Sequence, residues 1–167
     1  MTTNALHDLS GLSYRNVLVV DDEPAIHQMF SACLQPDQGE ATLTSDRDGD
    51  ILVDAPKHIY DFHVHAALSG EEALSLCKRR AALKSPVQLA FVDMRMRGWD
   101  GIDTILNLRE FDPRLNFVLV TGFPEPTRQQ AEERLGAAPL QIFPKPVKLE
   151  EIYNTAFALV KRWNRLH

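Results

Sequence analysis

The chain has 167 residues, of which 44% are hydrophobic and 25% charged, with a formal net charge of -5. This length and apolar content predict one domain with a single core, and the acidic balance argues against direct contact with nucleic acid, which needs a basic surface. No apolar run reaches the roughly 20 residues of a membrane span, and residues 1–16 lack the basic start and apolar centre of a signal peptide. We therefore expect a cytoplasmic protein without a membrane span.

The chain opens with a segment that has no hydrophobic periodicity. We expect residues 1–15 to form a loose N-terminal arm. Asn16–Val20 is a continuous β-branched and aliphatic run, which is typical of a strand buried on both faces in a parallel sheet. The run ends in Asp21 and Asp22, and Pro24 then fits the first turn of a helix.

Residues 36–60 interrupt this rhythm with a polar, acidic stretch that contains several prolines and glycines. The stretch is longer than a helix-to-strand connection needs, so we predict an insert between the first helix and the second strand. Ala41–Thr44 and Ile51–Val53 suggest a hairpin inside it. The Asp46–Asp50 spacing resembles the start of a calcium loop, but Lys57 occupies the position where such a loop has glutamate, and we reject a calcium site.

The remaining elements alternate between strand and helix. We predict further strands at 61–67, 89–92, 116–120 and 140–143, and further helices at 69–83, 101–110, 125–135 and 149–165. Ser69 and Glu72 have the spacing of a capping box at the start of the second helix. Five apolar strands alternating with five helices predict an α/β doubly wound parallel sheet, in which ligands bind at the carboxyl ends of the strands.

Chemically active side chains follow the predicted strands at the points where they end. Asp21 and Asp22 follow the first strand, Asp93 the third, Thr121 the fourth and Lys145 the fifth. Because these ends meet at one edge of a parallel sheet, we expect the side chains to converge. Carboxylate oxygens bind Mg²⁺, a carboxylate beside a metal can attack phosphorus to form an acyl phosphate, and lysine neutralises phosphoryl oxygens. The pattern predicts phosphoryl transfer to a carboxylate.

Several segments carry a resemblance to the receiver domain of bacterial two-component signalling. They are Val17–Glu23 (VLVVDDE), Ser69–Leu74 (SGEEAL), Asp93–Gly101 (DMRMRGWDG), Thr121-Gly122 and Phe143–Pro146 (FPKP). In this order they extend over nearly the whole chain, which makes the combination far more specific than any single piece. The resemblance implies a flavodoxin-like (βα)5 sheet of strand order 2-1-3-4-5. The receiver domain is then expected at residues 16–167, with the insert at 36–60.

The resemblance implies a phosphoacceptor and a metal site. Asp93 is the implied acceptor of the phosphoryl group. The implied cofactor is Mg²⁺ or Mn²⁺, and its oxygen ligands are Asp21, Asp22, Asp93 and the backbone carbonyl of Arg95.

Further residues are implied to bind the phosphoryl group or to report its presence. Thr121 and Lys145 are the implied phosphoryl-binding residues, and Thr121 and Phe143 the implied switch residues. The Lys145–Pro146 peptide bond is expected to be cis, since cis bonds cost least before proline. The residues implied to lie near the site are Met94, Gly122 and Pro146.

The resemblance also implies partners. A histidine kinase or a histidine phosphotransfer domain is the implied phosphoryl donor, and the chain is expected to catalyse its own phosphorylation rather than to act as an enzyme on a separate substrate. An output domain or a homodimer is expected to use the face formed by the fourth helix, fifth strand and fifth helix. Two features depart from the common pattern: Met96-Arg97 replaces a frequent Met-Pro, and the insert with Gly98–Gly101 resembles receivers attached to histidine kinase or cyclic-di-GMP modules.

Two other functions fit parts of the pattern. A phosphorylation-independent interaction module (a pseudo-receiver) would keep the fold, but the complete set of acidic and basic side chains argues against it. An aspartate-nucleophile phosphatase of the haloacid dehalogenase kind also uses Mg²⁺ and an acyl phosphate. Its nucleophile ends the first strand in an Asp-x-Asp pattern, whereas Asp21–Glu23 reads Asp-Asp-Glu.

Some residues have a structural and a functional interpretation. His58, His63 and His65 suggest a metal site, but no third ligand with clear spacing appears, and we favour a polar face under the insert. Trp99 is interpreted either as a partner contact or as packing on the third helix. Cys33 and Cys77 fall in helical patterns and are interpreted as small core residues.

Overall fold

The computed structural model describes residues 9, 11–35, 62–136 and 140–167. Within these residues, five strands form one parallel sheet in the order β2-β1-β3-β4-β5, so the predicted flavodoxin-like strand order is confirmed. The strands are β1 (Asn16–Val20), β2 (His63–Ala67), β3 (Leu89–Asp93), β4 (Asn116–Thr121) and β5 (Gln141–Pro144). β2 begins later than predicted because its pairing with β1 starts at Asn16 and His63.

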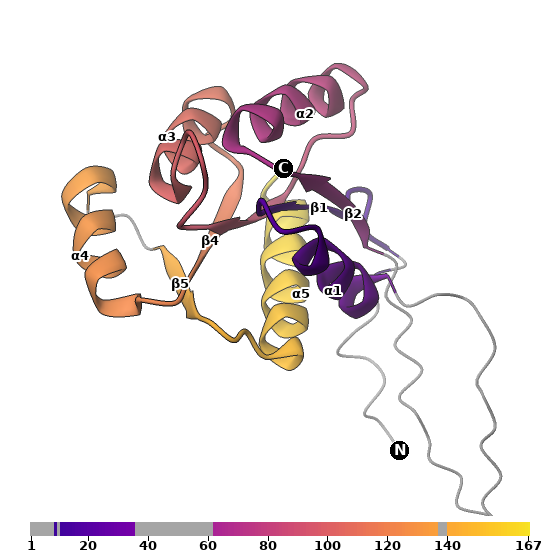
Figure 1. Ribbon diagram of the computed structural model, residues 1–167. Helices are drawn as coiled ribbons and strands as arrows, with labels where there is room; N and C mark the ends of the chain where they lie inside the picture. Colours follow the sequence, from indigo (N-terminus) through magenta and orange to yellow (C-terminus); the bar gives the residue numbers. More distant parts are fainter. Residues whose placement is uncertain (1–8, 10, 36–61, 137–139) are drawn as a thin grey trace, which may run out of the picture.

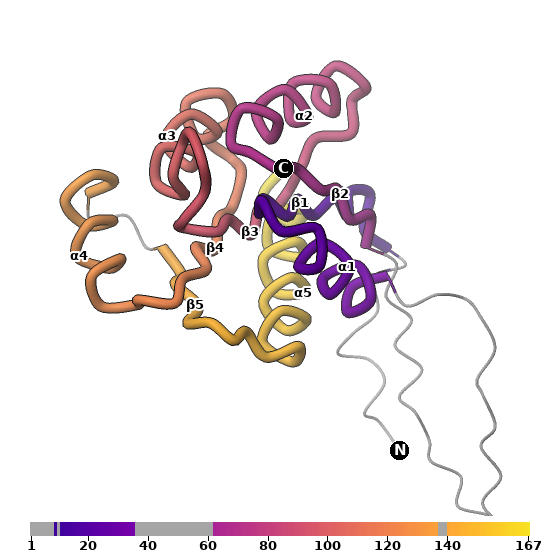
Figure 2. The backbone as a smooth tube through the Cα atoms, viewed as in Figure 1, coloured from indigo at the N-terminus to yellow at the C-terminus, as the bar shows by residue number. Residues whose placement is uncertain are grey.

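Helices cover both faces of this sheet, as a doubly wound fold requires. They are α1 (Pro24–Leu34), α2 (Gly70–Ala82), α3 (Gly101–Phe111), α4 (Pro124–Leu135) and α5 (Leu149–Leu166). α1 and α5 lie side by side on one face, and α2 and α3 pack together on the other, with α4 beyond α3 near β5 (Figure 1). Figure 2 follows the chain from each strand into the helix after it. No helix among the described residues is long and apolar enough to cross a membrane.

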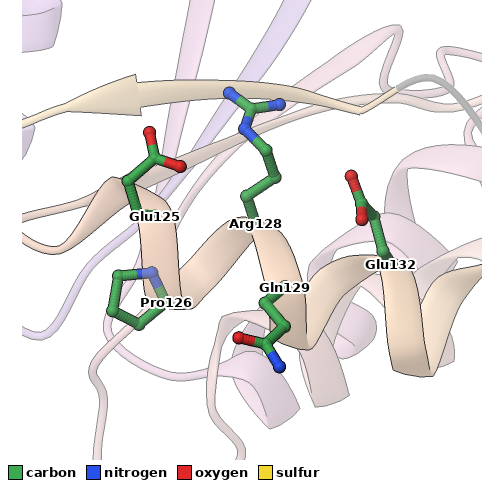
Figure 3. A pocket seen from close by; sticks show the side chains of 5 residues that line it. All are labelled: Glu125, Pro126, Arg128, Gln129 and Glu132. Atoms are coloured by element: carbon green, nitrogen blue, oxygen red, sulfur yellow. The ribbon is translucent and has the colours of Figure 1, made fainter.

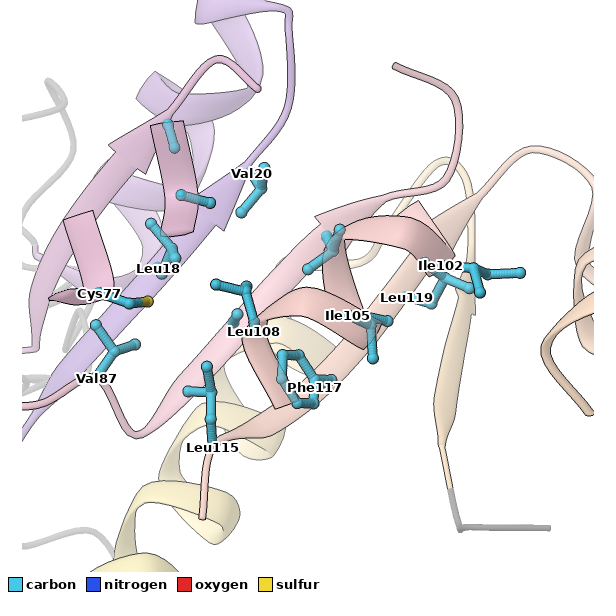
Figure 4. Close-up of a cluster of buried hydrophobic side chains, with 14 of the residues drawn as sticks. Leu18, Val20, Cys77, Val87, Ile102, Ile105, Leu108, Leu115, Phe117 and Leu119 are labelled. Carbon is cyan, nitrogen blue, oxygen red and sulfur yellow. The ribbon is translucent and has the colours of Figure 1, made fainter. Parts of the chain in front are cut away.

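The middle residues of the central strands are all apolar, because the two faces of each strand pack into different cores. In β1, Leu18 and Val20 belong to the cluster beneath α2 and α3 (Figure 4), whereas Val17 and Val19 belong to the cluster beneath α1 and α5. Successive strand residues point to opposite faces, so a strand covered on both sides needs a continuous apolar run. All five residues of β1 and of β3 are buried.

Side-chain caps fix the start of two helices on the α2–α3 face. The Ser69 hydroxyl accepts a hydrogen bond from the Glu72 N–H at 3.1 Å, and the Glu72 carboxylate accepts one from the Leu68 N–H at 2.8 Å. Asp100 and Asp103 cap α3 reciprocally. The capping box predicted for the second helix is confirmed, with its return bond reaching one residue further back.

The described part of the N-terminal arm is packed rather than loose. Leu9 is 1% exposed and belongs to the cluster beneath α1 and α5. The Tyr14 N–H donates to Asn164 Oδ1 at 3.1 Å, and Asn164 Nδ2 donates to the Tyr14 carbonyl at 2.7 Å. These contacts attach residues 9 and 11–15 to α5. The predicted insert, its suggested hairpin and the rejected calcium-like stretch lie outside the described residues.

Candidate functional site

Three carboxylates meet at the carboxyl edge of the sheet. Asp21 and Asp22 follow β1, and Asp93 is the last residue of β3. β1 and β3 pair in parallel with Val20 beside Val92, so both strands deliver their next residues to the same edge. The three side chains each offer an oxygen within 4.8 Å of the others. The convergence expected of these residues is therefore present in the structure.

The members of this carboxylate cluster, Asp21, Asp22 and Asp93, differ in burial and support. Asp21 is 3% exposed and Asp93 is 6% exposed, whereas Asp22 is open to solvent. The Glu23 N–H donates to the Asp21 carboxylate at 2.9 Å, and the Asp21 N–H donates to the Ala67 carbonyl of β2 at 3.1 Å. Asp21 and Asp93 are thus buried in the fold, and the cluster is accessible to solvent at Asp22.

Lys145 brings an ammonium group to the same edge. Its Nζ lies 2.9 Å from Asp93 Oδ1 and 3.8 Å from Asp21 Oδ2, and its side chain is 33% exposed. The Lys145 N–H donates to the Thr121 carbonyl at 2.8 Å, which ties the end of β5 to β4. The Lys145–Pro146 bond is cis, as expected. Lys145 therefore bridges two of the carboxylates.

The electrostatics of the cluster favour a further cation. Burial raises the pKa of Asp93, and the hydrogen bond and charge of Lys145 only partly offset this effect. Burial also raises the pKa of Asp21, where the nearby charge of Asp93 adds to the effect. For Lys145, burial would lower the pKa, but its hydrogen bond to Asp93, together with the negative charges of Asp93, Asp21 and Glu23, outweighs burial and raises the pKa. One ammonium facing three carboxylates leaves excess negative charge, and carboxylate oxygens are the donors that Mg²⁺ prefers.

Thr121 lies at the end of β4 beside this cluster, but its hydroxyl is engaged with α4. Its oxygen lies 2.9 Å from the hydroxyl oxygen of Thr127 and accepts a hydrogen bond from the Phe123 N–H at 3.1 Å. Thr121 and Thr127 are 2% and 3% exposed. The structure therefore places the expected phosphoryl-binding hydroxyl in a buried hydrogen bond with a helix residue.

The other residues expected near the site lie at or just after the ends of β3, β4 and β5. The Phe143 ring is half-buried and packs against Phe91 of β3, with centroids 6.4 Å apart. Met94 is buried, and Pro146 is exposed. A Cβ at Gly122 would have no atom within 4 Å, so the chain is open at this position. Phe143 is thus joined to the acceptor strand through one ring contact.

Arg95 makes two contacts on the loop after β3. Its backbone N–H acts on the Asp93 carboxylate, where it lowers the pKa and so opposes the effect of burial. Its guanidinium lies 4.4 Å from the centroid of the Phe123 ring, which is 54% exposed. Cation–π contacts of this kind are favourable even at exposed positions. The loop after β3 is therefore linked to the loop after β4.

The Gly98–Gly101 motif shapes the loop that carries the acceptor. Gly98 has a φ of +75°, a conformation that favours glycine. A Cβ at Gly101 would lie 2.7 Å from the Asp93 carbonyl oxygen, and the Gly101 N–H donates to the Met94 carbonyl at 2.9 Å. The Trp99 ring lies against Gly70 at the start of α2, a contact that neither interpretation of this residue had named.

The histidines do not form a metal site with any described residue. The carboxylate cluster is the one group of possible metal ligands found in the described ranges. His65 Nε2 lies 3.0 Å from Asn16 Oδ1, and burial lowers its pKa. His63 is exposed, and His58 lies outside the described residues. The favoured interpretation as a polar face agrees with these contacts.

The cysteines have the structural role expected of them. Cys77 is 4% exposed in the core beneath α2, and burial raises the pKa of its thiol to about 12. Cys33 is half-buried, and its thiol donates to the Leu149 carbonyl at 3.3 Å.

Sequence reasoning missed two residues of α4, one bonded to Thr121 and the other to the start of α3. Thr127 stands in a polar helix, where one hydroxyl gives no signal of its own. Arg134 forms ion pairs with Asp100, at 2.9 Å, and with Asp103. Asp100 and Asp103 have the i, i+3 spacing of a capping pair, which was the available signal for an anchored α3 start.

Comparisons with known proteins agree with this geometry. A family model for the response regulator receiver domain matches residues 51–157, a range that contains Asp93, Thr121 and Lys145 and begins after Asp21 and Asp22. Sporulation initiation phosphotransferase F of Bacillus subtilis (strain 168) is 28% identical over 91 residues, which are 54% of this chain and 68% of that protein.

Solved structures resemble the whole fold. A CheY-like response regulator receiver domain protein from Methanospirillum hungatei JF-1 has a TM-score of 0.65 at 16% identity, covering 93% of this chain and 100% of that one. A chain of the CheX-CheY-BeF3-Mg²⁺ complex from Borrelia burgdorferi has a TM-score of 0.62 at 18% identity, and the match covers 89% of this chain and 90% of that one. With a family match over more than half of its length, the chain belongs to the response regulator receiver domains of two-component signalling.

Proposed function

We propose that Asp93 accepts a phosphoryl group from a phosphohistidine donor in the cytoplasm, with Mg²⁺ or Mn²⁺ bound at the site, and that phosphorylation changes protein–protein contacts. The observation that carries this proposal is the position of Asp93 Oδ1, 2.9 Å from Lys145 Nζ within the carboxylate cluster. A nucleophilic carboxylate, further carboxylates for a metal and a fixed ammonium are the groups that phosphoryl transfer to aspartate requires.

The side chains divide the work of the transfer. A carboxylate oxygen of Asp93 attacks phosphorus, and the new O–P bond forms as the P–N bond to the donor imidazole breaks, with the electron pair leaving on the imidazole nitrogen. Lys145 then neutralises a phosphoryl oxygen in place of the Asp93 carboxylate. Asp21, Asp22, Asp93 and the Arg95 carbonyl would hold the metal, which, when bound, would offset charge on the phosphoryl oxygens.

The family supports a histidine kinase or a histidine phosphotransfer domain as the donor. The Bacillus relative is itself named a phosphotransferase, which supports a place in a phosphorelay. The donor's phosphohistidine would approach the exposed Asp22 side of the carboxylate cluster.

The proposed output face is formed by α4, β5 and α5. The outer side of α4 carries charged and amide side chains around a shallow hollow lined by Glu125, Pro126, Arg128, Gln129 and Glu132 (Figure 3). Such a surface suits partners that bind through charge and hydrogen bonds. An output domain or a second copy of the chain is the proposed partner.

Labelling with acetyl phosphate tests the acceptor. With Mg²⁺ present, the protein should take up one base-labile phosphoryl group, and Asp93→Asn should abolish this uptake because the amide is a poor nucleophile. Glu110→Gln removes an exposed carboxylate at the far end of α3 and serves as the matched control, with uptake unchanged. Full labelling of Asp93→Asn would refute the assignment.

Two measurements separate the alternatives. An interaction module without phosphorylation predicts no Mg²⁺ binding at millimolar metal. A phosphatase of the haloacid dehalogenase kind predicts repeated turnover of small phosphate esters, whereas the proposed receiver forms a stoichiometric phosphoaspartate.

A further inference from the structure

A buried hydrogen bond connects α4 to the residue proposed to bind the phosphoryl group. The hydroxyl oxygens of Thr121 and Thr127 lie 2.9 Å apart. On α4, the buried residues are Thr127 and Ala131, while the outer side of the helix is polar. Thr127 is thus one of the two α4 residues whose side chains are buried in the protein interior.

Strand alternation shows that Thr121 and Asp93 start on different faces of the sheet. Leu119 belongs to the cluster beneath α2 and α3. Thr121 comes two residues later on β4 and therefore projects toward the same face of the sheet. Phe91 belongs to the cluster beneath α1 and α5, and Asp93, two residues later on β3, follows its direction. To bond a phosphoryl group on Asp93, the Thr121 hydroxyl must therefore turn away from Thr127.

The hydrogen-bonding capacity of the hydroxyl leads to the same conclusion. A threonine hydroxyl has one proton and two acceptor positions. The Phe123 N–H already uses one acceptor position of Thr121, at 3.1 Å, and Thr127 bonds the same oxygen. When Thr121 donates its one proton to Thr127, a phosphoryl oxygen on Asp93, which can only accept, must take that proton from Thr127, and the two bonds then compete.

We infer that Thr127 is a positioning residue, which holds Thr121 away from Asp93 in the unphosphorylated protein. When Thr121 turns to the phosphoryl group, Thr127 is left buried without its partner, a state that proteins avoid. The beginning of α4 must then shift until the Thr127 hydroxyl finds water or another partner. This inference rests on the proposed function, and it couples phosphorylation of Asp93 to the position of α4 through one hydrogen bond.

Substitution of Thr127 by valine tests this role, because valine keeps the shape and removes the hydroxyl. Thr127→Val should bind beryllofluoride, in the presence of Mg²⁺, about fivefold more tightly than the natural protein, which corresponds to the net worth of one hydrogen bond. Thr127→Ser keeps the hydroxyl and should bind like the natural protein. Thr127→Ala gives the same test with a smaller side chain if the valine variant does not fold.

Two controls distinguish positioning from a general structural effect. Mg²⁺ affinity without beryllofluoride should be equal in all variants, because Thr127 belongs to no part of the carboxylate cluster. In a Thr121→Ala background, Thr127→Val should have no effect on beryllofluoride affinity, because the competing hydroxyl is already gone.

The outcomes separate this inference from the proposed function. If the natural protein binds Mg²⁺ but no beryllofluoride, the proposed function is wrong, and the inference fails with it. If the natural protein binds beryllofluoride and Thr127→Val binds equally or more weakly, the inference alone is overturned. Tighter binding by Thr127→Val that persists in the Thr121→Ala background would also overturn it.

Discussion

Lys145 is expected to have a different partner in each state of the site: the carboxylates before phosphorylation and the phosphoryl group afterwards. In the structure its ammonium satisfies part of the charge of Asp93 and Asp21, at 2.9 and 3.8 Å. In the proposed phosphorylated state it must bond the phosphoryl group instead. A metal at the carboxylate cluster competes with the ammonium for the same oxygens, whereas the phosphoryl group needs both cations. Loss of the Lys145 charge should therefore raise the affinity for the metal and lower the affinity for a phosphoryl group.

Lys145→Met tests this opposition. We expect Mg²⁺ affinity to rise about fivefold, because the metal no longer competes with a partly exposed ammonium. We expect beryllofluoride affinity to fall about tenfold or more, because a charge-assisted hydrogen bond is lost. Isothermal titration measures both. Lys148→Met, a change at an exposed lysine of the same loop, should alter neither affinity. A fall in both affinities of Lys145→Met would show that the lysine stabilises the site rather than competing with the metal.

At the scale of elements, the site depends on how closely α3 approaches the end of β3. Gly101, the first residue of α3, has no room for a side chain. A Cβ there would lie 2.6 Å from Leu119 Cδ1, 2.7 Å from the Asp93 carbonyl oxygen and 2.8 Å from Met94 Cα. Backbone atoms cannot move aside as a flexible side chain can. The glycine therefore allows the helix to begin directly against the acceptor residue.

Gly101→Ala should consequently destabilise the fold by about 2 kcal/mol, the typical cost of overpacking, and should slow phosphorylation by acetyl phosphate because the Asp93 backbone is displaced. Urea unfolding and labelling rates measure the two effects. Gly122→Ala is the matched control for stability, since a Cβ there meets no atom within 4 Å. Equal unfolding free energies for the two variants would contradict the argument.

At the scale of the whole molecule, residues 9 and 11–15, before β1, pack against the core. Leu9 is 1% exposed within the cluster beneath α1 and α5, where Phe62 is also buried. The Tyr14 and Trp163 rings make an edge-to-face contact with centroids 5.5 Å apart. The Arg114 guanidinium lies 5.4 Å from the centroid of the same indole. The described residues of the arm, 9 and 11–15, thus belong to the packed domain and contribute to its cooperative stability.

Leu9→Ala should lower the free energy of unfolding by about 3 kcal/mol, the usual cost of truncating a buried leucine. Gly11→Ala changes the same segment at a position where an added Cβ contacts nothing, and should leave stability nearly unchanged. Urea denaturation compares the two variants. A loss below 1 kcal/mol in Leu9→Ala, with an unchanged m-value, would mean that the segment contributes little to the fold.

Much of the fold could be predicted because local sequence and burial coincide in it. β1, β3 and β4 are continuous apolar runs apart from polar residues at their ends, since each packs against helices on both faces. The approach of Asp21, Asp93 and Lys145 was also predictable, because parallel strands must bring their carboxyl ends to one edge. These inferences need only the order of strands and the residue that follows each of them.

The sequence by itself determined the strand order, through the resemblance, and the identity of the acidic and basic residues at the sheet edge. Only the tertiary structure decided that Thr121 bonds Thr127, that Arg134 holds the start of α3, and that Leu9 is a core residue. Each of these contacts joins segments whose local patterns are polar or irregular. Their partners depend on the distance and angle between packed elements, and no periodicity along the chain encodes that geometry.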